Sequence, residues 1–594
     1  GTVGATQKSK VPFDVDQINT SQLPVPTVNP ATAIQGKVAG VQVVANSGRP
    51  GAGASILLRG PTSIDASGRS QDPLYIVDGV ILNSGLVDLD ALDIQSIEIV
   101  KGAAAASLYG SRAAAGVIQI TTKSGKRLQG DQVRYTIRSE YGQSGLASYP
   151  DALLSLHHPY AMSGGQFVEQ DGSTCKWLAC PAQPQLAGQL ANGGTPSQWN
   201  TYQTQNWPGK TYNQVKRFFT SGLYMQNYFA AEGRSGATNY HVSISNLQNQ
   251  GVMRFMKGFS RTNFRVNLDQ TVLENLQVSA SAFYSRSTQN QFPETQGNPM
   301  FDLTRMPAGV DLLAPDPKDP SRVILVPDPS NTESPNPIYT IKHRDYTEGR
   351  GRFLGSANVR FSPLSWIDFD ANASYDRLDM NRNDLYPKGY ATPTVNLTLN
   401  NGNLNKNQTV DEALNASITA TMNFQLTGNI HNRTQLRYLY ESDDYNYVRT
   451  SGNTFAVAQV PTLENLDQTT VTATSTQQTV RSDGYFVISN FDIMDKYVID
   501  ALVRNDGSSL FGADQRRQWY YRIGGAWRIA QEPWFNIPGV DELKLRYSLG
   551  TAGGRPRFVA QYETFSVSGG PRRWTACPTC CRSCCRPTRG SRRC

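Results

Sequence analysis

Hydrophobic and polar residues alternate through most of the chain after about residue 131, in segments of roughly ten residues. Val133, Tyr135 and Ile137 fall on one face of the first segment, opposite polar residues. Two later segments place His241 and Arg265 on their polar faces. The same period recurs at 239–247, 263–268, 276–286, 352–361, 365–375, 414–424, 430–440, 484–491, 497–503, 519–529 and 543–549. This pattern predicts strands with one apolar face, close to the length that crosses a bilayer at a tilt.

The connections between these segments alternate between tight and long. Short turns at 362–365, 425–429 and 492–495 join neighbouring segments, whereas 378–412 and 441–482 are predicted as long polar loops. Short turns at one end and long loops at the other are typical of an outer-membrane β-barrel. The alternative is a soluble β-sandwich, whose strands are usually shorter and whose loops differ less in length. The pattern favours the barrel.

Residues 11–126 follow a different pattern. A short helix is predicted after residue 30, with Ile34 and Val38 on one face, and a glycine ends it. Five short strands are predicted, at Val41–Val44, 55–59, Leu74–Val77, 96–100 and Val117–Thr122. This segment is predicted to form a small mixed sheet with helices, about the size of one compact domain.

The composition agrees with a β-rich protein. Only 18% of the 594 residues are charged, and Tyr (27) outnumbers Phe (22). No run of 18 or more apolar residues occurs, so a helical membrane span is not predicted. The net charge of +8 comes mostly from residues 572–594, which contain seven Arg and no acidic residue. The charge therefore does not indicate nucleic-acid binding.

The sequence offers little catalytic chemistry. HExxH, GxSxG and phosphate-binding GxxxxGK[ST] motifs are absent. The adjacent His157 and His158 could bind a metal, but a solvated loop is the favoured interpretation. Cys175 and Cys180 form a disulfide or remain free thiols, and the sequence favours neither. We predict no catalytic residue, no metal site and no cofactor, and therefore not an enzyme.

Six of the eight cysteines lie in the last 24 residues, 571–594. Cys577 and Cys580 have the CxxC spacing of a zinc or redox site. However, other cysteines there are vicinal and no histidine follows. An aberrant tail, from a shifted reading frame or an assembly fault, is the favoured interpretation.

Three segments in order resemble one family. They are ILLRG at 56–60, PLYIVDGV at 73–80, and a small-residue run that contains LYGSRAAAGVI at 108–118. Together they resemble the plug domain of TonB-dependent outer-membrane receptors, in the SusC/RagA-like branch. The plug signature residues are Arg59, Gly60, Asp78, Gly79, Lys101, Gly102, Tyr109, Gly110 and Gly116.

The resemblance implies a mainly β fold, with a small α/β plug inside a transmembrane antiparallel β-barrel of about 22 strands. About thirteen to fifteen strands can be counted here, so the barrel looks truncated. The implied domains are a remnant at 1–10 after a missing TonB-box region, a plug at 11–126, a partial barrel with long extracellular loops at 127–570, and the tail at 571–594. No signal peptide is seen.

The resemblance also implies a function and a site. The protein would import oligosaccharides or peptides across the outer membrane of a Gram-negative bacterium, its plug gated by force from TonB. Its partners would be TonB with its inner-membrane motor, a SusD-like surface lipoprotein, the ligand and outer-membrane lipid. The loops at 61–71 and 82–88 would face the substrate. The candidate binding residues are Thr62, Ser63, Asn83 and Ser84 in these loops, together with Arg59 just before the first loop.

Two alternatives remain open on the same resemblance. A non-transporting surface receptor, adhesin or sensor could use the same scaffold. A non-functional fragment is the other, because an incomplete barrel leaves two strand edges unpaired.

Overall fold

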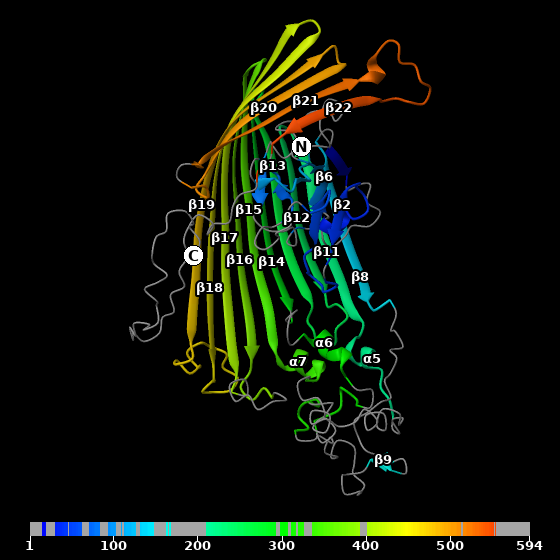
Figure 1. The fold of residues 1–594 in the computed structure, drawn as a ribbon, viewed down its shortest axis with the longest axis vertical. Coiled ribbons are helices and arrows are strands. Elements are labelled where there is room, and N and C mark those ends of the chain that lie inside the picture. Colours follow the sequence, from blue (N-terminus) through cyan, green and yellow to red (C-terminus); the bar gives the residue numbers. More distant parts are fainter. Residues whose placement is uncertain are drawn as a thin grey trace, which may run out of the picture.

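The protein is described from a computed structural model. The structure describes residues 15–19, 30–45, 47–61, 71–82, 89, 93–102, 109, 112–125, 131–147, 162–163, 166–167, 210–290, 292, 298–306, 310–316, 319–325, 335–391, 401–512, 515–551 and 553. Strands dominate these residues, and they form a small N-terminal unit and one large curved sheet (Figure 1).

The described residues of the N-terminal unit form one helical turn and seven strands. Its elements are β1 (Val15–Asn19), α1 (Pro30–Ala33), β2 (Val41–Val44), β3 (Ser55–Leu58), β4 (Leu74–Val77), β5 (Val80–Leu82), β6 (Ile94–Val100) and β7 (Val117–Thr122). Five strands form a sheet in the order β1-β6-β7-β4-β5, in which only the β4–β7 pair is parallel, and β2 pairs with β3 separately. The sheet is mixed, as predicted, because β4 and β7 are joined by a crossover while the other neighbours are antiparallel.

The predicted strands of this unit are confirmed, and its core follows from their apolar faces. Ile56 and Ile99 are fully buried, and Ile34, one of the two predicted helix-face residues, is 1% exposed. The helix itself ends at Ala33, and turns lead from there to Gly40. It is thus shorter than predicted, because glycines at positions 36 and 40 both adopt left-handed backbone angles.

Thirteen of the described strands form the large sheet, which we call the wall. They are β8 (Val133–Ser144), β11 (Gly222–Ser235), β12 (Thr238–Asn249), β13 (Phe259–Leu273), β14 (Leu276–Asn290), β15 (Asp345–Leu364), β16 (Ile367–Tyr386), β17 (Asn403–Thr427), β18 (Ile430–Asn453), β19 (Thr472–Ile493), β20 (Tyr497–Ser508), β21 (Arg517–Arg528) and β22 (Lys544–Gly550). Each pairs antiparallel with its neighbour in chain order, and the described strands leave β8 and β22 at the two edges.

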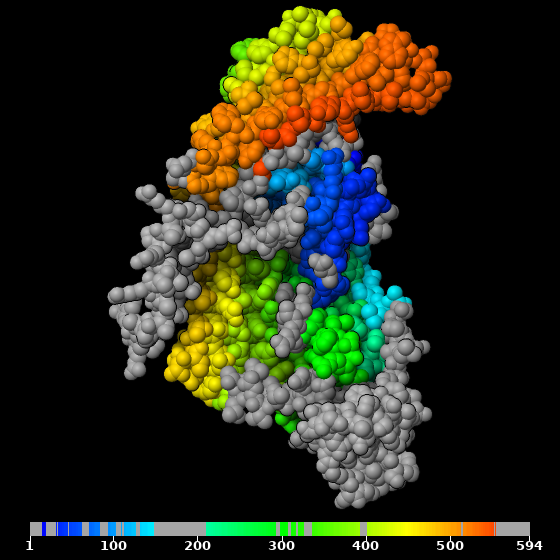
Figure 2. All heavy atoms as spheres, viewed as in Figure 1, coloured from blue at the N-terminus to red at the C-terminus, as the bar shows by residue number. Residues whose placement is uncertain are grey.

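The outer face of the wall is apolar and its inner face is polar, which is the reverse of a soluble protein. The side chains of Ile137 and Tyr547 are 79% and 74% exposed on its outer face, whereas His241 and Arg265 on the inner face are buried. Figure 2 shows the N-terminal unit, in blue, lying in the hollow of the green and yellow wall. An apolar outer face and a polar, filled interior are the pattern of a plugged transmembrane β-barrel.

Two predicted loops are largely strand, which corrects the sequence prediction. Residues 378–386 and 403–412 belong to β16 and β17, and residues 441–453 and 472–482 belong to β18 and β19. Polar side chains occupy both faces there, so the alternation that marks a strand disappears. The backbone ladder nevertheless continues, as in the pairing of Leu404 with Gly452. Main-chain hydrogen bonds rather than apolar contacts hold these strand ends.

The two ends of the wall differ as predicted. Two-residue turns join β15 to β16 and β17 to β18 at one end, where the sequence predicted tight connections. The other end carries α5 (Gln214–Phe218), α6 (Pro299–Thr304) and α7 (Pro337–His343), together with the short strands β9 (Met162–Ser163) and β10 (Gln166–Phe167). A 3-10 turn, η6 (Ile529–Gln531), follows β21.

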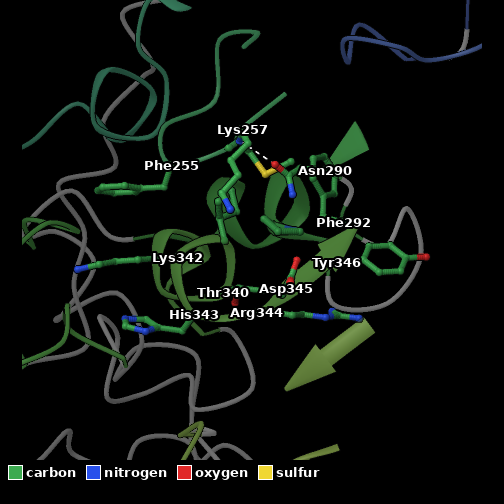
Figure 3. Close-up of a pocket in the computed structure, with 13 residues that line it drawn as sticks. Phe255, Lys257, Asn290, Phe292, Thr340, Lys342, His343, Arg344, Asp345 and Tyr346 are labelled. Carbon is green, nitrogen blue, oxygen red and sulfur yellow. Dashed lines mark hydrogen bonds between the residues drawn. The ribbon is translucent and has the colours of Figure 1, made fainter. Parts of the chain in front are cut away.

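The three helices pack on one another at this end through an apolar cluster that includes Phe218, Leu303 and Tyr339. A cavity of about 250 Å³ lies beside α7 (Figure 3). Among the described residues, none of the helices is both long and apolar enough to cross a membrane.

Candidate functional site

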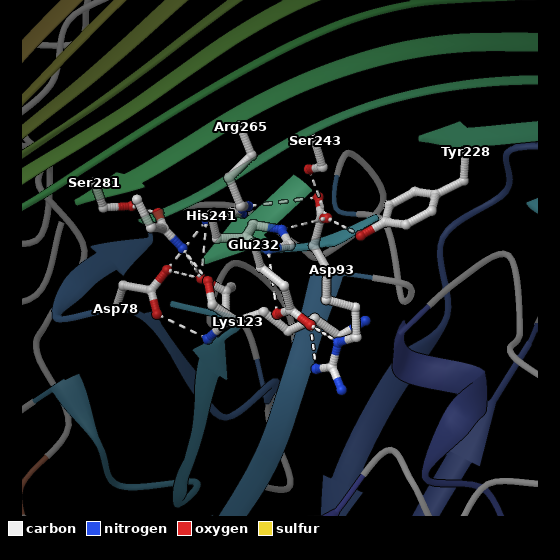
Figure 4. Close-up of polar contacts among 12 residues, drawn as sticks. Asp78, Asp93, Lys123, Tyr228, Glu232, His241, Ser243, Arg265 and Ser281 are labelled. Atoms are coloured by element: carbon white, nitrogen blue, oxygen red, sulfur yellow. Dashed lines mark hydrogen bonds and ion pairs between the residues drawn. The ribbon is translucent and has the colours of Figure 1, made fainter. Parts of the chain in front are cut away.

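The N-terminal unit touches the inner face of the wall through apolar side chains such as Phe283 and Ile488 and through polar groups, and one cluster of the polar contacts stands out (Figure 4). Its centre on the N-terminal unit is formed by Asp93, just before β6, and Asp78, just after β4. Its centre on the wall is Arg265 in β13. These residues are far apart in sequence and are brought together only by the fold.

Asp93 is held by three adjacent strands of the wall. Its Oδ1 accepts hydrogen bonds from Ser243 Oγ at 2.7 Å and from Tyr228 Oη at 3.0 Å. Arg265 Nε lies 3.6 Å from the other carboxylate oxygen. Burial alone would raise the pKa of Asp93, but contacts with His241, Arg265 and Ser243 outweigh it and hold that pKa below the usual aspartate range. The carboxylate is therefore charged at neutral pH.

Arg265 joins Asp93 to the turn after β4. Its Nη1 lies 3.1 Å from Asp78 Oδ2, and its guanidinium lies 4.7 Å from the ring centroid of Phe283. Arg265 is 2% exposed, so this cation is almost fully removed from water. A buried cation requires compensating charge, and the two aspartates of the N-terminal unit supply it.

Asp78 also fixes the local backbone. Asp78 and Gly79 have φ angles of +48° and +86°, which make the sharp turn between β4 and β5. The Asp78 carboxylate accepts hydrogen bonds from the backbone N of Thr122 at 2.9 Å and from its hydroxyl at 2.6 Å. The turn signal in the sequence thus marks a residue that ties β4 to β7 and also contacts the wall.

Thr122 extends the contact towards β13 and β14. Asn267 Nδ2 donates to Thr122 Oγ1 at 2.8 Å and to the carbonyl of Lys123 at 2.6 Å. Ser281 Oγ in turn donates to Asn267 Oδ1 at 2.7 Å. The result is a chain of short polar side chains in which most donors have an acceptor.

His241 lies between two carboxylates in this cluster. Its Nε2 is 3.5 Å from Asp93 Oδ1, and its Nδ1 is 3.7 Å from Glu232 Oε2. Both distances are long for a hydrogen bond. Glu232 also accepts from Arg134 Nε at 2.5 Å. The ring is fully buried, so it is shielded from solvent between these acids.

A second contact lies on another part of the wall. Arg112 Nη1 of the N-terminal unit is 3.1 Å from Glu441 Oε1 and 3.6 Å from Asp443 Oδ1, both in β18. Burial would lower the pKa of Arg112, but the two acids outweigh it and raise that pKa. The N-terminal unit therefore contacts the wall at β11–β13 and again at β18.

The remaining signature residues have structural contacts within the N-terminal unit. Lys101 Nζ donates to the carbonyl of Ala39 at 2.9 Å and pairs with Asp16 at 2.5 Å. Arg59 has a φ of +61°, and its backbone N donates to the carbonyl of Gly40 at 2.8 Å. Tyr109 Oη donates to Gln119 at 3.3 Å, and burial raises the pKa of that phenol to about 12.

The glycines of the signature meet specific steric needs. Gly60, Gly102 and Gly116 all have positive φ angles, and a Cβ at Gly116 would lie 2.6 Å from Leu58. The other predicted residues, Thr62, Ser63, Asn83, Ser84, Gly110, Cys175 and Cys180, lie outside the described residues, as do His157, His158 and the tail. Among the described residues, no group of three or more His, Cys, Asp or Glu could hold a metal ion.

The sequence analysis did not select Asp93, Glu232, His241 or Arg265 as site residues. A signal was present for two of them, since the alternation placed His241 and Arg265 on polar faces. A charged residue in a regularly alternating strand needs a partner once that face is covered. The partners could not be identified, because 172 residues separate Asp93 from Arg265.

Comparison with known proteins decides the family. The family model described as TonB-dependent Receptor Plug Domain matches residues 7–117. The chain is 26% identical over 583 residues to TonB-dependent receptor P26 of Formosa agariphila, and 24% identical over 562 residues to TonB-dependent receptor SusC of Bacteroides thetaiotaomicron. The chain belongs to the TonB-dependent receptors, in their SusC/RagA-like branch. The N-terminal unit of this receptor is its plug, and the wall belongs to its barrel.

The alignments also set the extent of the match. They cover 93% and 89% of this receptor chain but 52% and 50% of the two relatives, so the chain spans about half the length of the curated relatives it matches. The family consists of receptors and transporters rather than enzymes.

Solved structures share the fold. The RagAB peptide importer in its 'closed-closed' state has a TM-score of 0.74 at 22% identity, covering 94% of this chain and 62% of that chain. The unliganded ferric citrate transporter FecA has a TM-score of 0.52 at 11% identity, covering 88% and 61%.

Proposed function

We propose that this receptor imports oligosaccharides or peptides across the outer membrane of a Gram-negative bacterium, and that force from TonB displaces its plug. A SusD-like surface lipoprotein would hold the ligand against the outer end of the barrel. The family supports this assignment, and so does the RagAB importer, which shares the fold and carries peptides according to its description.

The single observation that carries the proposal is the polar contact between plug and wall. Asp93, Asp78 and Thr122 meet Ser243, Arg265 and Asn267 through hydrogen bonds and ion pairs. Some wall side chains, such as Phe283 and Ile488, also join the apolar clusters of the plug. Polar contacts of this kind can be exchanged for water when the plug moves, whereas exposing an apolar interface would cost free energy in proportion to its area. A plug held in this way suits a gate.

We further propose that the plug loops at 61–71 and 82–88 face the ligand. Arg59, Thr62, Ser63, Asn83 and Ser84 supply hydrogen-bonding groups there. Arg59 stands at the start of the first loop with a left-handed backbone, so the chain turns sharply as it enters this loop.

The test separates binding from import. The receptor is produced in a Gram-negative host with its SusD-like partner, and uptake of fluorescent oligosaccharides and peptides is measured with TonB present and with TonB deleted. Uptake that requires TonB, together with surface binding that does not, is expected. Binding without uptake in both hosts would instead support a surface receptor or sensor. No contact among the described residues favours that alternative.

A further inference from the structure

The cavity beside α7 is lined by Pro299 of α6 and by residues from three further segments. It lies at the end of the wall opposite the two-residue turns, which is the outer end of a barrel of this kind. Loop residues 255–257 form one side, Asn290 and Phe292 a second, and residues 340–346 a third. Its volume of about 250 Å³ is below the usual range for a drug-sized ligand and suits one small unit of a longer molecule. None of these residues was selected from the sequence.

Two lysines give this cavity its charge. Figure 3 shows Lys257 on the loop before β13 and Lys342 on helix α7, with the Lys342 side chain on the same side as Phe255. Both side chains are exposed, and the structure gives neither ammonium a carboxylate partner among the described residues. Arg344, by contrast, is paired with Asp384 through two contacts of 2.8 Å. The two lysines therefore retain their positive charge for a ligand.

Phe255 shows that the mouth of the cavity is under constraint. It has a φ of +67°, a left-handed conformation that is a true outlier for a bulky residue. Its ring is 49% exposed and lies 5.8 Å from the ammonium of Lys342. A strained aromatic residue kept at a surface cavity costs free energy and is a feature of ligand sites.

His343 adds a polar group without adding charge. Its ring lies 4.6 Å from Tyr339, and its buried Nε2 has no hydrogen-bond partner among the described residues. Burial, followed by the charges of Lys342 and Arg322, lowers the pKa of His343, so the ring is neutral at neutral pH. The imidazole therefore adds no positive charge to the lining of the cavity.

We propose that this cavity binds one carboxylate-bearing sugar unit, a uronate, of an acidic oligosaccharide. The inference rests on the proposed function and narrows its substrate class. The two ammonium groups attract the carboxylate, the exposed ring of Phe255 offers a flat apolar surface for the sugar ring, and the exposed Asp345 suits the hydroxyls. An acidic peptide would fit less well, because it has neither the ring face for Phe255 nor the ring hydroxyls for Asp345.

A single residue, Phe292, connects the cavity to the plug. Phe292 lines the cavity, and the guanidinium of plug residue Arg49 lies 4.9 Å from the Phe292 ring and donates to its carbonyl at 3.4 Å. Beside it, Gln289 Nε2 donates to the carbonyl of Pro50 at 2.6 Å. A ligand in the cavity would thus contact a residue that itself contacts the plug.

The experiment measures binding to the purified full chain in detergent by calorimetry. The probes are trigalacturonate, the neutral maltotriose and triglutamate. Trigalacturonate is expected to bind, and the double variant Lys257→Gln/Lys342→Gln is expected to weaken it by about tenfold or more. Raising the salt concentration from about 0.05 M to about 0.3 M should weaken binding to the parent chain more than to the variant.

The matched control is Lys216→Gln, which removes an exposed lysine from α5 in the same region but outside the cavity. It should leave the affinity unchanged. Preferential binding of triglutamate, equal binding of maltotriose, or equal losses in the double variant and in Lys216→Gln would overturn the inference. Since no transport is measured, the expected binding pattern supports the inference even if uptake fails the test of the proposed function.

Discussion

At the scale of single residues, Arg265 decides how the plug is seated. It is the one described cation within ion-pair distance of both Asp78 and Asp93, and it is almost fully buried. Removing it leaves both carboxylates without this cation in a site with little water. The cost of breaking a buried ion pair by removing one partner is far larger than the cost of losing an exposed pair.

We therefore predict that Arg265→Ala lowers the free energy of plug opening by about 3–5 kcal/mol. Hydrogen exchange of the β4 and β7 amides would measure this opening. The control is Arg360→Ala, whose guanidinium is 53% exposed and 3.5 Å from Asp368 in β16. It should cost about 0–1 kcal/mol. Equal effects of the two variants would contradict the role given to Arg265.

Asp93 should make the seating of the plug depend on pH. Its pKa is lower in the folded protein than in an unfolded chain, where an aspartate has a pKa of about 3.9. Its contribution to stability is therefore complete above about pH 4 and is lost as the pH falls from there towards the lower folded value. Between about pH 5 and 8 this residue should cause no change.

The variant Asp93→Asn isolates that contribution, because other acids of the plug titrate as well. The difference in plug opening between parent and variant, followed by hydrogen exchange corrected for intrinsic rates, should be constant at neutral pH and shrink below about pH 4. A difference that stays the same at about pH 3 would show that the charge of Asp93 is not what the wall recognises.

At the scale of elements, the sequence predicted position well and length poorly. The strands of the plug and the hairpins of the wall lie where alternation and turn residues placed them, since apolar side chains must face either the plug core or the outside. The ends of β16 to β19 were missed because polar residues fill both faces there. The contact between plug and wall was missed because it depends on which strands meet, and local pattern does not carry that information.

The connection before β7 depends on a single glycine. Gly116 has a φ of +97°, and a Cβ there would lie 2.6 Å from Leu58 Cδ1 and 3.0 Å from the carbonyl of Val100. Gly116→Ala should destabilise the plug by about 1–3 kcal/mol, from backbone strain and overpacking together. Gly48→Ala in the same unit is the control, because it has no unusual φ and no neighbour within 4 Å. Protease cleavage within the plug would report both variants, and comparable resistance would refute the steric argument.

At the scale of the whole molecule, the plug connects parts of the wall that are distant in the sheet. The Asp93 and Asp78 cluster contacts β11, β12 and β13, while Arg112 contacts β18, and four strands stand between β13 and β18 in the sheet order. A plug held at one contact remains close to the other, so the second contact can re-form readily. Losing both contacts should therefore destabilise the seated plug more than either single loss suggests.

The variants Arg112→Ala and Arg265→Ala and the double variant test whether losing both contacts destabilises the plug more than the two single losses suggest. Each single variant should raise exchange mainly in the plug segments nearest the lost contact, β7 for Arg265 and the segment before it for Arg112. The double variant should expose the whole plug sheet together, with β4, β6 and β7 exchanging at one rate, because both ion-paired anchors of the plug are lost and the hydrogen bonds and apolar contacts that remain are weaker. Mass spectrometry of exchanged peptides separates these patterns. If the double variant merely repeats the Arg265→Ala pattern, the Arg112 contact does not hold the plug, and release by force would need to break only the β11–β13 contact.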